Sequence, residues 1–133
     1  MRIITCLDQN GGLFFNQRRQ SRDRLLITDL LHFCKGNQLY ISAYSQELFP
    51  DSVPVLTAED PLTAAKAGTF CFVEGLLLAP VEETIEELIL YRWDKVYPAD
   101  VFLDLDLSQW NLQSTYDFVG SSHDKITREV YTK

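Results

Sequence analysis

The sequence has few of the residues from which common metal sites are built. It contains only two histidines, His32 and His123, and three cysteines, none of which forms a Cys-x-x-Cys pair. Two histidines exclude a histidine-rich metallohydrolase site, and we expect no bound metal. Each cysteine stands among apolar neighbours, which predicts reduced, buried thiols in a cytoplasmic protein.

Long apolar runs are also missing. The longest, from Leu76 to Val81, contains a proline and is far too short to span a bilayer. The first residues enter a strand-like segment directly, without the pattern of a signal peptide. We therefore expect no contact with a membrane.

Positive charge is scarce in the middle of the chain, where residues 47–106 carry thirteen acidic and three basic groups. Residues 1–46, in contrast, carry six basic and three acidic groups, and the formal net charge of the whole chain is −7. An acidic surface does not attract a phosphate backbone, so nucleic-acid binding is not expected.

The composition that remains is ordinary for a globular protein. The chain has 133 residues, of which 46% are hydrophobic and 23% charged, which is too apolar for disorder. No repeat, low-complexity tract or long linker divides it. We expect a single domain over residues 1–133.

Strand and helix signals alternate along the first 93 residues. Residues 2–7 (RIITCL) are a short β-branched apolar run, typical of a buried strand. A helix is predicted over 22–34, with Ser21 as its cap and Gly36 as its stop. Further strands are predicted at 39–41, 52–57, 69–75 and 88–93, and further helices at 42–49, 59–67 and 80–87. This order predicts a mostly parallel sheet with helices on both faces.

The pattern changes after residue 93. Residues 100–107 (DVFLDLDL) alternate strictly between apolar and polar or exposed positions, and 110–120 and 126–131 read as two more strands. We expect these segments to complete the sheet as an antiparallel edge. The predicted fold class is α/β, with a mostly parallel central sheet and an antiparallel C-terminal portion.

This element order, together with particular residues, resembles dihydrofolate reductase. The similar segments are ITCLDQNGGLFFN (4–16), SRDRLLITDLLHF (21–33), CFVEG (71–75) and ELILYRW with YPADVFLDLDLSQWNLQS (87–114). Their order covers nearly the whole chain. The chain is similar to a divergent, shortened member of that family.

The resemblance implies a pocket for a small heteroaromatic molecule such as a pterin. Asp23, matching the only ionisable side chain of the family's active site, would grip a 2-amino-4-oxo ring and promote its protonation. It would act from the first turn of the 22–34 helix, with Tyr91 across the pocket. The walls of this pocket would be Ile4, Phe14, Ile27 and Tyr91.

The resemblance also implies NADPH, which would pass Gly12 and Gly75, where small residues allow close backbone approach. Several departures weaken this expectation. The segment that holds the cofactor's adenosine half is missing, no arginine lies between Arg24 and Arg92, and Glu74 replaces the first glycine of a Gly-Gly turn. No other cofactor is expected.

Each of these residues also has a plain structural interpretation. An acid at the start of a helix complements the helix dipole without any further role. Arg18, Arg19, Arg22 and Arg24 could clamp an anion, but a solvated charged face is the simpler interpretation. The segment Ser121–Asp124 (SSHD) is assigned to a turn, because adjacent residues cannot supply a catalytic triad.

Two functions follow from these observations. One is an NAD(P)H-dependent reductase of a pterin or related heteroaromatic ligand. The other is a non-catalytic module that kept the fold, lost the cofactor site and binds a small ligand or a protein. Asp23 and the Gly12 loop favour the reductase, whereas Glu74 and the missing segment favour the binding module.

Overall fold

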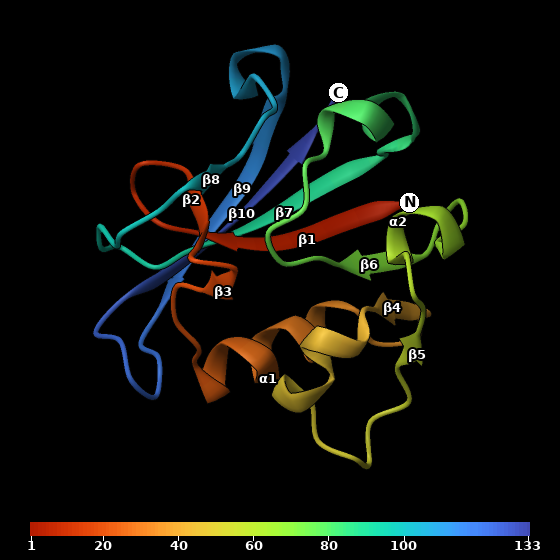
Figure 1. Cartoon of the computed structure of the whole chain (residues 1–133), viewed down its shortest axis with the longest axis horizontal. Helices are drawn as coiled ribbons and strands as arrows, with labels where there is room; N and C mark the ends of the chain where they lie inside the picture. Colours follow the sequence, from red (N-terminus) through yellow and green to blue (C-terminus); the bar gives the residue numbers. More distant parts are fainter.

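The computed structural model describes residues 1–133, and its centre is one seven-stranded sheet (Figure 1). The spatial order is β5 (Leu56–Thr57), β4 (Leu39–Ile41), β6 (Phe70–Phe72), β1 (Arg2–Leu7), β7 (Glu87–Arg92), β10 (Ile126–Thr132) and β9 (Asn111–Phe118). The first five of these are parallel to one another, and β10 is antiparallel to both β7 and β9. The predicted α/β class, the mostly parallel sheet and its antiparallel C-terminal portion are confirmed.

Strand β1 lies in the middle of the sheet and is covered on both faces. Ile3 and Ile4 point to opposite sides, and both are fully buried. Ile4 belongs to the apolar cluster beneath the main helix, and Ile3 belongs to the cluster on the other face. This burial on two sides explains why the segment is a continuous apolar run.

One face of the sheet is covered by α1 (Arg24–Phe33) and η1 (Ala43–Leu48), a 3-10 helix. Leu26, Ile27 and Leu30 are the buried residues of α1. The helix begins later than predicted and is capped by Asp23 rather than Ser21, because the Asp23 carboxylate accepts the N–H groups of Leu25 and Leu26.

The helices that cover the opposite face are all short. These are α2 (Pro61–Ala64) and the 3-10 helices η2 (Ala79–Thr84) and η3 (Leu107–Gln109). The predicted helices at 59–67 and 80–87 are therefore shorter than expected. As a result this face has less cover than the α1 face.

A small second sheet holds the loop that follows β1. It consists of β2 (Gly12–Phe15), β3 (Arg18–Arg19) and β8 (Val101–Phe102), all antiparallel. The prediction that 100–107 extends the main sheet is wrong, since β8 pairs with β2 instead. After β8, the Asp104 carboxylate accepts the backbone N–H groups of Leu78 and Ala79.

The three cysteines are free thiols. Cys34 and Cys71 are buried as predicted, and burial raises the pKa of each to about 12, whereas Cys6 is partly exposed. No group of three or more His, Cys, Asp or Glu side chains is arranged to hold a metal ion. None of the helices is long and apolar enough to cross a membrane.

Candidate functional site

The Asp23 carboxylate lies at the beginning of α1 and is enclosed by protein donors. Its Oδ1 accepts hydrogen bonds from the N–H groups of Leu25, Leu26 and Ser121 and from the Ser121 hydroxyl. Its Oδ2 accepts from the N–H and hydroxyl of Ser122 and lies 3.0 Å from Nδ1 of His123. The Asp23 side chain is 0% exposed. A carboxylate offers about four acceptor positions, so these seven donors use them all.

The donors from Ser121–His123 belong to the connection between β9 and β10, which crosses over the start of α1. Gly120 allows this close approach, because a Cβ at that position would lie 2.3 Å from Oδ2 of Asp23. The loop therefore fits onto Asp23 only with glycine at its first residue.

These contacts keep Asp23 ionised. Burial alone would raise the pKa of its carboxyl group, but the backbone N–H groups of Ser121 and Ser122, followed by His123, outweigh burial. The net result is that the pKa of Asp23 lies well below the usual range of an aspartate. The group acts as an acceptor only.

Tyr91 does not face Asp23, and the prediction that the two residues meet across a pocket is wrong. The Tyr91 hydroxyl donates to Oδ2 of Asp29 at 2.6 Å, and Arg128 binds the same carboxylate at 2.7 Å. Burial and the neighbouring Asp29 both raise the pKa of Tyr91. The Tyr91 ring packs in the core with Ile4 and Ile27.

Little space is left in the predicted pocket between β1, α1 and β7. A cavity of about 20 Å³ remains, lined among others by Asp23, Ile27, Phe72 and Trp93, and a separate hollow of about 260 Å³ lies beside α1, lined by Asp23, Ile27 and Leu31 among others. The cavity of about 20 Å³ holds about one water molecule. The ligand-binding roles of Ile4, Ile27 and Tyr91 would therefore require these side chains to move.

Phe14 lies elsewhere, against the turn that contains Gly75. A Cβ built on Gly75 would be 2.5 Å from two atoms of the Phe14 ring, and Gly75 has a φ of +69°. The place where the resemblance puts a cofactor is thus covered by an aromatic side chain. Gly12 is buried in β2, and a Cβ there would lie 2.6 Å from that of Ala99.

Arg19 is not available for an anion. Its Nε and one terminal nitrogen donate to both oxygens of Glu74, at 2.7 and 3.0 Å, and a second terminal nitrogen binds Glu47. Its guanidinium carbon also lies 4.3 Å from the centre of the Tyr44 ring. Arg18, Arg22 and Arg24 are exposed and form no ion pair, so the predicted anion clamp is not assembled here.

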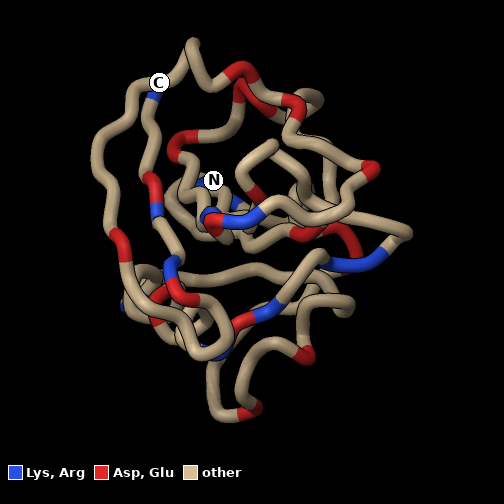
Figure 2. The backbone as a smooth tube through the Cα atoms, turned by 90° about the vertical axis from the view of Figure 1, so that its left-hand side faces the viewer, with Lys and Arg blue, Asp and Glu red and all other residues tan.

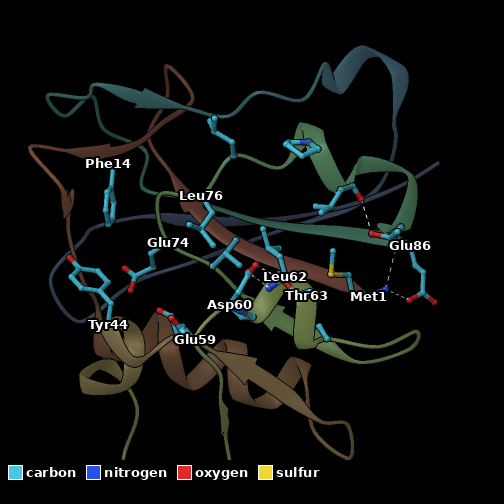
Figure 3. Close-up of a pocket in the computed structure, with 18 of the residues that line it drawn as sticks. Met1, Phe14, Tyr44, Glu59, Asp60, Leu62, Thr63, Glu74, Leu76 and Glu86 are labelled. Carbon is cyan, nitrogen blue, oxygen red and sulfur yellow. Dashed lines mark hydrogen bonds and ion pairs between the residues drawn. The ribbon is translucent and has the colours of Figure 1, made fainter.

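A large groove lies on the face of the sheet that the short helices leave open (Figure 3). Its volume is about 1220 Å³, and we call it the α2–η2 groove after the elements on its two sides. Figure 3 shows Phe14, Tyr44 and Glu74 at one end and Met1 and Glu86 at the other. Its apolar lining includes Leu62, Val73, Leu76, Leu77 and Val81.

The groove contains acidic side chains and no lysine, arginine or histidine. The acids are Glu59, Asp60, Glu74 and Glu86. Asp60 caps α2, Glu74 is paired with Arg19, Glu86 is paired with the N-terminal ammonium group of Met1, and Glu59 is exposed without a partner. Figure 2 shows that acidic positions are spread over several loops of the molecule rather than gathered in one cluster.

The sequence did not indicate that His123 and the two serines before it contact Asp23. The segment was assigned to a turn, and it does connect two antiparallel strands. Its partner lies about a hundred residues earlier in the chain. A glycine followed by Ser-Ser-His carries only a weak signal for such a contact.

Comparison with known proteins supports the fold alone. The structure is similar to that of dihydrofolate reductase from Enterococcus faecalis, which was solved with NADP(H) and the compound RAB-propyl. The TM-score is 0.68 at 14% sequence identity, and the match covers 98% of this chain and 94% of the other. No family model and no curated protein sequence matches the chain.

Proposed function

We propose that this chain, which has the dihydrofolate-reductase fold, is a binding module that has lost the reductase site. The state of Asp23 carries this proposal. Its carboxylate is buried and bonded to the 121–123 loop, so no acceptor position is left for a heterocyclic substrate. A reductase would need that carboxylate to face its ligand.

The side chains present do not fit an anionic dinucleotide. Phe14 covers Gly75, and the lining of the α2–η2 groove has no cationic side chain and two carboxylates, Glu59 and Asp60, that are not paired with a cation. A pyrophosphate there would be repelled by groups of its own sign. We derive no reaction through a nicotinamide cofactor.

The α2–η2 groove fits a segment of a partner protein with apolar and basic side chains. Its volume is above the range of roughly 300–1000 Å³ that is usual for small-molecule sites. Its walls are apolar, Leu77 is 56% exposed, and the only charged side chains in its lining are acidic. An amphipathic helix with apolar anchors and lysines on its flanks matches both properties.

The test compares two labelled helical peptides of equal length, one of leucine and lysine and one of leucine and glutamate. We expect the basic peptide to bind, with an affinity that falls as salt is added, and the acidic peptide not to bind. Leu77→Ser should weaken binding, while Leu112→Ser, at a residue 51% exposed on β9, should not.

A second measurement titrates the protein with NADPH in a calorimeter. Micromolar binding of NADPH, or steady oxidation of NADPH with dihydrofolate, would overturn the proposal and restore the reductase. Equal binding of the basic and acidic peptides would also contradict it.

A further inference from the structure

His123 is held at both ring nitrogens by side chains that lie far from it in the sequence. Its Nδ1 is 3.0 Å from Oδ2 of Asp23, and its Nε2 is 3.1 Å from Oγ of Ser21 and 3.0 Å from the hydroxyl of Tyr97. The ring stacks on Trp93 with 4.6 Å between centroids, and its side chain is 2% exposed. The imidazole is therefore fixed in position and orientation.

The ionised state of Asp23 decides which nitrogen carries the proton. A carboxylate only accepts hydrogen bonds, so Nδ1 of His123 must donate to it. In a neutral imidazole, Nε2 then has one free lone pair, which accepts a proton from either the Ser21 or the Tyr97 hydroxyl. The Ser21 hydroxyl thus points its proton at a base that a buried acid orients.

We propose that Ser21, His123 and Asp23 form a nucleophile, a base and a positioning acid, and that Ser21 is acylated by small carboxylic esters. This arrangement, with a base in hydrogen-bond reach of a hydroxyl and a third group on the base, is the signature of an activated serine. The members come from the segment before α1 and from the β9–β10 loop. The positions of these three residues in the sequence do not reveal this arrangement.

The reaction consumes only an ester and water. Ser21 Oγ attacks the carbonyl carbon while its proton passes to Nε2 of His123. The tetrahedral intermediate expels the alcohol, which takes up that proton, and an acyl-serine ester remains. Water then attacks the acyl carbon by the same route, giving the carboxylic acid and returning the proton to Ser21.

The surroundings of Ser21 limit the acyl group. Ser21 is partly exposed, whereas His123 and Asp23 are buried, so an ester can approach only from the serine side. The cavity that Ser21 shares with Asp23 has a volume of about 20 Å³. Because that volume holds about one water molecule, we expect only a small acyl group, acetyl, to react, with the ester reaching Ser21 from its exposed side.

Tyr97 competes with Ser21, because one lone pair accepts one hydroxyl proton well at a time. Tyr97→Phe removes the competing hydroxyl and should leave Nε2 to Ser21. We expect this variant to react faster than the wild-type protein, and a slower reaction would contradict this part of the proposal.

The test is labelling with a fluorophosphonate, in which Oγ attacks phosphorus and expels fluoride, followed by intact-mass analysis and peptide mapping. We expect one adduct, on Ser21, and a burst of about one equivalent of nitrophenol from p-nitrophenyl acetate. Ser21→Ala should abolish both signals. Ser114→Ala, an exposed serine on β9, should retain both.

Circular dichroism of each variant shows that it is folded. An unlabelled wild-type protein, or the same adduct in folded Ser21→Ala, would overturn the proposal. The α2–η2 groove is a different site with different residues, so either proposal can fail while the other holds.

Discussion

The two faces of the central sheet differ in how completely helices cover them. On the α1 face, ten residues of helix and a buried polar network leave a cavity of about 20 Å³ and a hollow of about 260 Å³ beside the helix. On the other face, the four-residue α2 and the six-residue η2 leave a groove of about 1220 Å³. The length of the covering helices, rather than the sheet itself, decides which face stays open.

The comparison extends to the polar groups. On the closed face the carboxylate of Asp23 is fully used by internal donors, which include the ring of His123. On the open face Glu59 has no internal partner and remains available to a ligand. A buried, satisfied carboxylate contributes stability, whereas an exposed one contributes charge.

The largest expected effect is a difference in the free energy of unfolding between variants of Asp23 and Asp60, two aspartates that both cap helices. Asp23→Ala should lower the free energy of unfolding by about 3–5 kcal/mol, because it leaves buried donors and His123 without their acceptor. Asp60→Ala, at the exposed cap of α2, should cost about 1 kcal/mol. Urea unfolding measures both, and equal losses would contradict the contrast between the faces.

The second effect concerns the glycine beneath Phe14. Gly75→Ala combines a left-handed φ, which costs about 1–2 kcal/mol, with a clash that adds about 1–3 kcal/mol. Gly68→Ala, at a φ of +79° with nothing within 4 Å of its Cβ, should cost only the first amount.

Adding Phe14→Ala to Gly75→Ala tests the origin of that difference. The double variant should lose the clash but keep the backbone cost, as a double-mutant cycle in thermal unfolding would show. If Phe14→Ala brings no relief, then Phe14 does not cover Gly75 in solution.

The third effect is a pH dependence on the closed face. Because folding lowers the pKa of Asp23, its contribution to stability is present above the unfolded aspartate pKa of about 3.9. That contribution is lost as pH falls through the lower, folded pKa, at up to about 1.4 kcal/mol per pH unit. Asp23→Asn should flatten the acid limb of stability against pH, and an unchanged slope would contradict this assignment.

Local patterns predicted the elements that depend on near neighbours. The apolar run at 2–7, the periodicity of α1 and the stop at Gly36 were all visible, because burial on one or two faces sets these patterns. The alternation of 100–107 was also visible, and Leu105 is buried while Asp106 is exposed. This alternation did not indicate which of the two sheets the segment would join.

The sequence by itself determined the α/β order and the parallel strands, and it placed Asp23 at the beginning of a helix. Only the tertiary structure decided what Asp23 does there, because its partners Ser121, Ser122 and His123 arrive from a loop about a hundred residues away. Packing also decides how long the covering helices are. Because α2 ends after one turn, a groove remains on its face of the sheet. Propensity acts over a few residues, whereas contacts between distant loops depend on how the whole chain is folded.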